Sequence, residues 1–136
     1  MRKWISEHPF LWIVTVMILL GVILSILSPF FLTSGNVTNL LKQVSILSLL
    51  AAGQTLVILS AGIDLSIGSV LALSAVLMGG FMNINGMAPI LAIILGVLAA
   101  SGIGAFNGLV IAKAKIPPFI VTLGMMGIAR GLALVY

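Results

Sequence analysis

The side chains that could carry chemistry are few in this sequence, and they stand within long apolar stretches. Asp64 is the only acidic residue after the N-terminal head, and Ser66 follows it in the segment Asp-Leu-Ser-Ile-Gly. A carboxylate at this position can cap the helix that follows. Alternatively, it shapes a break in a helix that lines a polar pathway, because ionisable groups among apolar residues are functional candidates. Both interpretations stay open.

Arg130 is the second ionisable group within an apolar stretch, and it lies about 16 Å into that stretch if the stretch is helical. A guanidinium in such surroundings needs a partner, either the backbone carbonyls of other helices, a carboxylate or a bound substrate. Gln54, Thr55 and Asn107 are polar residues that also lie within apolar stretches. They either hold helices together or line a pathway for a hydroxylated solute, and taken singly they favour the first role.

Signatures of catalysis are absent from the sequence. It contains no Gly-x-x-x-x-Gly-Lys-Ser/Thr phosphate loop, no cluster of metal ligands and no histidine-based triad. We therefore predict that the chain is not an enzyme and binds no cofactor or metal of its own. Six Lys and Arg residues against two Asp and Glu residues give a net charge of +4, but the basic residues do not form the patch that nucleic-acid binding would need.

The composition decides which elements must position these residues. Hydrophobic residues make up 62% of the chain and charged residues 6%, with a mean hydropathy of +1.39. Such a chain cannot hide its apolar surface from water, so lipid must be its solvent. Only helices and closed barrels satisfy the backbone in lipid, and the continuous apolar runs exclude the alternation of a barrel. The predicted fold is an all-α, polytopic transmembrane helical bundle in one domain, 1–136.

The apolar runs predict about five spans. Spans two and three flank the Asp64 segment and either cross fully or form a broken, re-entrant pair, while residues 30–39 read as a loop. Arg2, Lys3, Lys113 and Lys115 place the N-terminus and the Lys113–Lys115 loop in the cytoplasm. The spans are approximately 10–28, 40–60, 64–82, 89–112 and 119–136.

Small residues recur at helical spacing and predict close packing between spans. Span four has one every four residues: Gly96, Ala100, Gly104 and Gly108. Such a face lets two helix backbones approach, which is how helices associate in lipid. These four residues are the predicted packing face.

Two segments of the sequence resemble the sugar-type permeases of ABC importers, the ribose permease family. The first is 53–69, with Ala-Gly-Ile-Asp-Leu-Ser-Ile-Gly at its centre, and the second is 116–131, with Ile-Pro-Pro-Phe at its start. The resemblance implies a monosaccharide importer of the bacterial cytoplasmic (inner) membrane. Its expected partners are membrane lipid, a second permease copy, cytoplasmic ATP-binding subunits that hold the ATP, and a periplasmic or lipid-anchored sugar-binding protein. Asp64, Ser66 and Arg130 carry over as members of the two motifs.

Members of that family are roughly twice as long as this chain, so the resemblance also implies an N-terminal portion of a permease. Two other functions stay open. One is a small oligomeric exporter, which would typically place an acidic residue in the first span, where this chain has none between residues 10 and 28. The other is a structural membrane subunit without a pathway of its own.

Overall fold

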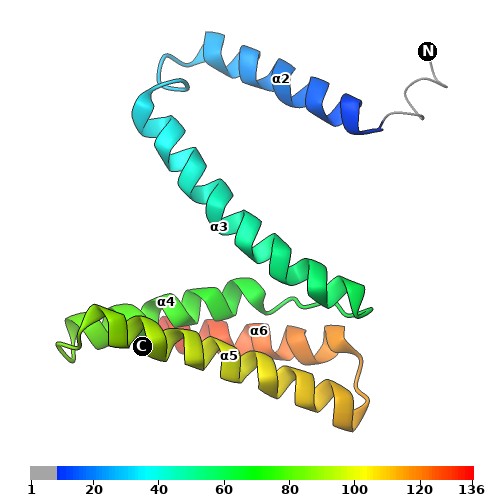
Figure 1. Ribbon diagram of the computed structural model, residues 1–136, viewed down its shortest axis with the longest axis vertical. Coiled ribbons are helices and arrows are strands. Elements are labelled where there is room, and N and C mark those ends of the chain that lie inside the picture. Colours follow the sequence, from blue (N-terminus) through cyan, green and yellow to red (C-terminus); the bar gives the residue numbers. More distant parts are fainter. Residues whose placement is uncertain (1–8) are drawn as a thin grey trace. The chain divides into compact units, whose positions relative to one another are not determined.

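The computed structural model describes residues 9–136, which form five α-helices joined by short loops (Figure 1). Within this range there is no strand, so the predicted all-α class is confirmed. Four helices are long and apolar enough to cross a membrane: α2, α3, α5 and α6. The fifth, α4, is shorter, at 17 residues. The helices are α2 (Pro9–Leu27), α3 (Ser34–Leu59), α4 (Ile67–Asn83), α5 (Pro89–Ala114) and α6 (Pro118–Val135). Arg2 and Lys3 lie outside the described residues, so the cytoplasmic N-terminus stays a prediction.

Contacts group the chain into two units, residues 1–49 and residues 50–136. In the first unit, α3 begins at Ser34, earlier than the Leu40 that the sequence predicted. The polar residues that suggested a loop start the helix instead. The Thr33 hydroxyl accepts the Asn36 N–H at 3.4 Å, and the Asn36 side chain donates to the Phe31 carbonyl at 2.6 Å. The first bond satisfies an N–H group that a helix start leaves without a partner, and the second fixes the first turn of α3 to the chain before it.

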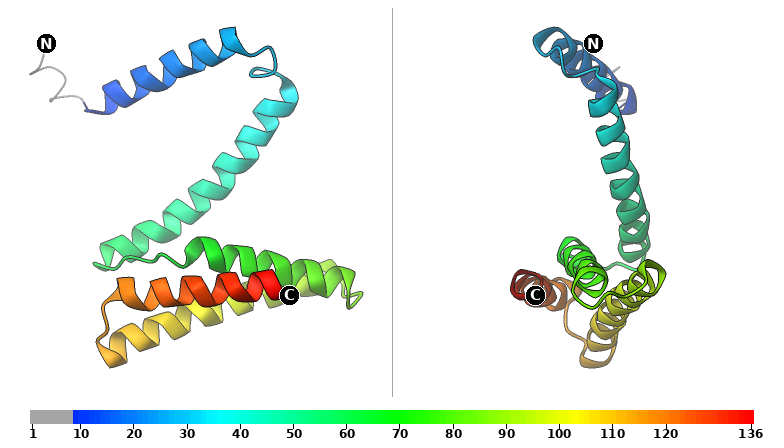
Figure 2. Two further views of the ribbon diagram at one scale, coloured as in Figure 1. Left: turned by 180° about the vertical axis from the view of Figure 1, so that it is seen from behind. Right: turned by 90° about the vertical axis from the view of Figure 1, so that its left-hand side faces the viewer.

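In the second unit α4 packs against both α5 and α6 (Figure 2). Contacts at both ends give the directions: α4 runs antiparallel to α5 and parallel to α6. The start of α4 lies beside Asn107 of α5, and Gly80 near its end lies against Tyr136, next to α6. Among residues 9–136, the buried apolar side chains are those of Leu73, Ala92 and Ala129. Two of these three are alanines, as expected where helices approach closely in lipid.

The four small residues of the predicted packing face fall into different surroundings. A Cβ added to Gly96 would overlap the side chain of Met78, so α5 approaches α4 closely at this point. Ala100 is half-buried. A Cβ added to Gly104 or Gly108 would meet nothing within 4 Å. Among the described residues, another helix therefore packs closely against this face only at Gly96.

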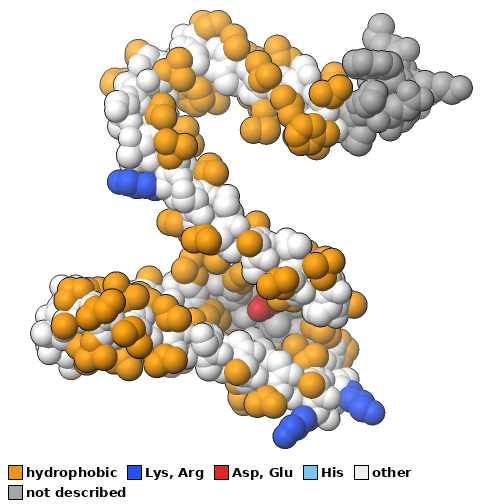
Figure 3. All heavy atoms as spheres, viewed as in Figure 1, with side chains coloured by type: hydrophobic (Ala, Val, Ile, Leu, Met, Phe, Trp, Pro, Cys, Tyr) orange, Lys and Arg blue, Asp and Glu red, His pale blue; other side chains and the backbone are white. Residues whose placement is uncertain are grey.

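Large apolar side chains cover the outer faces of the helices. Figure 3 shows them along every helix in view, with charged groups only at a few places. Leu, Ile, Val and Phe residues more than half exposed occur on α2, α3, α5 and α6. Water would not tolerate so much continuous apolar surface, whereas lipid does.

Candidate functional site at the break between two helices

The chain leaves α3 through a tight C-terminal cap. Ala61 adopts a left-handed conformation with φ 58°. The Gly62 N–H donates to the Val57 carbonyl at 3.0 Å, and the Ala61 N–H donates to the Ile58 carbonyl at 2.9 Å. This pair of bonds is a Schellman motif, which normally places glycine where Ala61 stands. The following residues, 62–66, are not helical, and we call them the break between α3 and α4.

Replacing Ala61 by glycine is expected to stabilise the protein by about 0.5–1 kcal/mol, because a left-handed conformation strains any residue with a Cβ. The measurement is the thermal unfolding midpoint of the purified protein in detergent. The matched control is Ala52→Gly in the interior of α3, which should lower stability by about 0.5–1 kcal/mol. Equal losses for both variants would contradict the assignment of the cap.

Asp64 organises the turn that enters α4. Its Oδ1 accepts the Ser66 N–H at 2.7 Å and the Ser66 hydroxyl at 2.6 Å. Ser66 is the N-cap residue of α4 and makes no capping bond through its own side chain. The carboxylate therefore fixes the residue before the helix through an Asx-type turn, rather than binding the N–H groups of the first helical turn.

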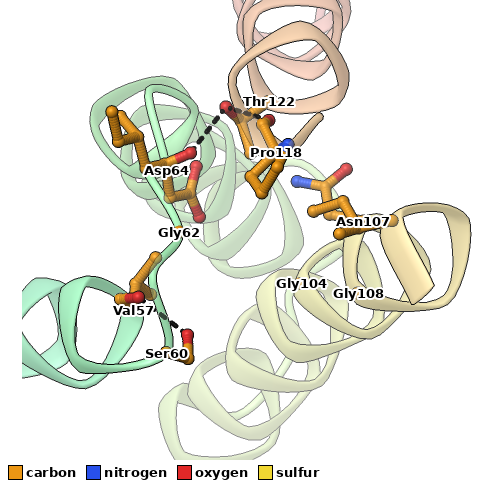
Figure 4. A pocket seen from close by; sticks show the side chains of 11 residues that line it. Val57, Ser60, Gly62, Asp64, Gly104, Asn107, Gly108, Pro118 and Thr122 are labelled. Atoms are coloured by element: carbon orange, nitrogen blue, oxygen red, sulfur yellow. Dashed lines mark hydrogen bonds between the residues drawn. The ribbon is translucent and has the colours of Figure 1, made fainter. Parts of the chain in front are cut away.

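Two side chains from other helices hold this break in place (Figure 4). The Asn107 Nδ2 of α5 donates to the Ser66 Oγ at 3.3 Å. The Thr122 hydroxyl of α6 lies 3.2 Å from the Ile63 carbonyl and 2.9 Å from the Pro118 carbonyl of its own helix. Ser66, Asn107 and Thr122 are all buried. The residues of the break thus join α4, α5 and α6 through a polar network inside an apolar unit.

Along the helix axes, the break lies at a level inside the end of α5 and the start of α6, not at the level of these helix ends. Asn107 is seven residues before the end of α5, and Thr122 is four residues after the start of α6. At 1.5 Å per residue these offsets are about 10 Å and about 6 Å. If the Lys113–Lys115 loop is cytoplasmic, the break lies about one to two helical turns inside that surface. Non-helical backbone at such depth is tolerated where it is buried in protein or lines a cavity.

A cavity of about 270 Å³ adjoins the break. On its α5 side the cavity is lined by Asn107 and by two glycines, Gly104 and Gly108, which have no side chains to fill the space. Within the described part of the chain, two buried acceptors have no hydrogen-bond partner. One is the Asn107 Oδ1, whose residue lines this cavity, and the other is the Gln54 Oε1, whose residue does not. Asp64 adds a carboxylate to the cavity wall. With the hydroxyls of Ser60 and Thr122, the cavity wall carries polar side chains that can bond the hydroxyl groups of a solute.

The other predicted site residues lie apart from this cavity. Arg130 lines a separate groove between α4 and α6. The Thr55 hydroxyl is exposed and donates to the Ala51 carbonyl of its own helix at 2.7 Å. Sequence reasoning singled out Asp64 and Ser66, which do meet, but did not include Thr122 among the candidates. Its only signal was a hydroxyl one turn after the Pro117-Pro118 pair, and spacing alone does not reveal the partner 59 residues away.

Comparison with known proteins gives the following matches. The family model described as "Branched-chain amino acid transport system / permease component" matches residues 36–136. The ribose import permease of Bacillus subtilis (strain 168) is 52% identical over 118 residues, which are 87% of this chain and 36% of that protein. The ribose import permease of Escherichia coli (strain K12) is 39% identical over 135 residues, 99% of this chain and 41% of that protein. The fructose import permease of Rhizobium meliloti is 45% identical over 117 residues, 86% and 32% respectively.

No solved structure matches this chain. The chain spans about two fifths or less of the length of these curated relatives. The resemblance to ribose-type permeases that segments 53–69 and 116–131 predicted is confirmed. Together with helices suited to cross a membrane, the matches show that the protein is an integral membrane protein, and that it belongs to the family of branched-chain amino acid transport system permease components.

Proposed function

We propose that this chain forms the N-terminal part of the transmembrane subunit of an ATP-driven importer of monosaccharides. The observation that carries the proposal is the 39% identity to the ribose import permease of Escherichia coli over 99% of this chain. The relatives named above are called permeases for ribose and fructose, so a monosaccharide is the proposed substrate class.

The polar break supports a role in forming the translocation pathway. It places Asp64, Asn107 and Ser60 around a cavity within an otherwise apolar unit, and its acceptors match the hydroxyl groups of a sugar. Broken helices at membrane depth recur in transporters, where they line the substrate route. Asp64 and Ser66 are the proposed organisers of this route.

The proposed assembly supplies what the chain itself does not. Two cytoplasmic ATP-binding subunits would provide the energy, a second permease copy would complete the pathway, and an extracytoplasmic or lipid-anchored sugar-binding protein would deliver the substrate. The assembly would lie in the bacterial cytoplasmic membrane with Lys113 and Lys115 facing the cytoplasm. No chemical step is assigned to this chain.

A chimera tests the proposal directly. In the Escherichia coli ribose permease, this chain replaces the segment that aligns with it. The chimera is expressed in a strain without its own ribose permease, and uptake of radiolabelled ribose is measured. Uptake well above that of the deletion strain is expected, since the matched segment covers 99% of this chain. The control is the same chimera without the ATP-binding subunits, which should not transport. A chimera that reaches the membrane yet takes up neither ribose nor fructose would contradict the proposal.

A further inference from the structure

A second hollow lies on the surface of the three-helix unit, between α4 and α6. It is about 580 Å³ in volume, and we call it the Arg130 groove after its one charged residue. Its α4 wall is made of small and apolar side chains, and its α6 wall carries Arg130 among apolar side chains. The lining residues are Leu65, Gly68, Ser69, Ala72 and Val76 on one side and Met126, Arg130, Ala133 and Leu134 on the other.

Arg130 has no carboxylate partner among residues 9–136. Asp64 is the only acidic residue in that range, and it lines a different cavity. The Ile63 carbonyl lies at the level of Thr122, and Arg130 stands eight residues further along α6, a rise of about 12 Å. Depth therefore separates the two charges by about two helical turns, so Asp64 does not supply a counter-charge to Arg130.

A second copy of this chain does not supply that charge from its own Asp64. Copies paired about an axis along the membrane normal keep every residue at the same depth. The offset between Asp64 and Arg130 would therefore persist across such an interface.

The shape of the groove fits a helix. A Cβ at Gly68 would meet nothing within 4 Å, Ala72 is exposed, and a stripe of small residues lets another helix backbone approach closely. Besides Arg130, the only polar side chain in the lining is that of Ser69. The rest of the lining is apolar, which suits the surface of a membrane-spanning helix.

We propose that the Arg130 groove is the docking surface for one membrane-spanning helix that carries an Asp or Glu at the depth of Arg130. The small residues of α4 receive its backbone, and the guanidinium pairs with its carboxylate. The pair replaces an arginine exposed to lipid with a hydrogen-bonded ion pair. The proposal does not depend on which solute the permease carries.

Carboxyl labelling with dicyclohexylcarbodiimide tests the charge. This apolar reagent modifies neutral carboxyl groups within the bilayer, and mass spectrometry identifies the residue. In membranes that contain the assembled permease, Arg130→Leu should produce a labelled Asp or Glu outside residues 9–136 that is unlabelled in the wild type, because a carboxylate without its cation takes up a proton. Arg130→Lys is the control and should keep the protection. Identical labelling of the wild type and Arg130→Leu would overturn the proposal.

A bulky substitution tests the helix independently of the charge. Ala72→Trp should abolish the intact permease complex seen by size-exclusion chromatography in mild detergent, whereas Ala72→Ser should retain it. The groove, at about 580 Å³, has room for an indole ring when no helix fills it. If Ala72→Trp abolishes the complex and Ala72→Ser does not, a helix must therefore occupy the groove. A normal complex with Ala72→Trp would overturn the proposal and would favour a groove filled by lipid or open to solute. Neither measurement uses transport, so the outcome is separable from the test of the proposed sugar import.

Discussion

Asp64→Ala is expected to lower the free energy of unfolding of the permease by about 2–4 kcal/mol. The alanine removes the acceptor that holds both the Ser66 N–H at 2.7 Å and the Ser66 hydroxyl at 2.6 Å. A buried donor left without its acceptor costs about 1–3 kcal/mol, and the buried Ser66 would keep two such donors. Ser66 is also the residue that Asn107 contacts, so the loss should spread to the junction with α5. The measurement is the thermal unfolding midpoint in detergent.

Asp64→Asn is the control that separates hydrogen bonding from charge. Its amide oxygen can accept the same two bonds, so the loss should be only about 1 kcal/mol, because uncharged hydrogen bonds are roughly half as strong. Uptake in the chimera then distinguishes the two roles of Asp64 that the sequence left open. Normal folding with lost uptake indicates that the charge serves the pathway. If alanine and asparagine cost the same stability, the Asx-type turn does not contribute as described.

Much of the fold could be predicted because lipid simplifies the problem. Long apolar runs without charges leave the helix as the only element, and four of the predicted spans correspond to helices long enough to cross. The break around Asp64 was also readable, since the segment 60–66 combines a glycine, an acid and two serines between apolar runs. Such residues favour turns over helix. The start of α3 was wrong because the same turn-forming residues also serve as helix caps.

The tertiary contacts of the site could not be predicted in the same way. Ser66 meets Asn107 across 41 residues, and Ile63 meets Thr122 across 59 residues. Hydrophobic periodicity assigns a residue to a helix, but in a membrane it does not say which face meets which neighbour, since lipid and protein interior are both apolar. For the same reason Asp64 and Arg130, the two charges in apolar sequence, could be suspected of pairing, whereas they lie in separate hollows.

At the junction between α4 and α5, one buried hydrogen-bond acceptor has no partner among the described residues. The Ser66 hydroxyl donates to Asp64, so the amide of Asn107 must present its Nδ2 to the Ser66 oxygen. Its Oδ1 is then left buried without a donor within the described residues. A buried acceptor without a partner costs about 1–3 kcal/mol. Strain of this kind tends to be retained where it serves function.

Asn107→Leu is therefore expected to leave the stability of the permease unchanged or to raise it by up to about 2 kcal/mol, while uptake by the chimera falls at least about tenfold. Leucine has a similar volume and removes the orphaned Oδ1 together with the 3.3 Å bond to Ser66, whose hydroxyl still donates to Asp64. Losing that bond costs about 0.5–1.5 kcal/mol, and removing an unpaired buried acceptor regains about 1–3 kcal/mol. Gain of stability with loss of activity is the usual trade-off at a site that retains strain for function. The measurements are the thermal unfolding midpoint and initial uptake of radiolabelled ribose. Asn107→Ala is the matched control, which removes the same amide but leaves a cavity and should lower both quantities. A destabilised Asn107→Leu variant would mean that Oδ1 has a donor in the assembled permease, and normal uptake would mean that the amide only holds α4 against α5.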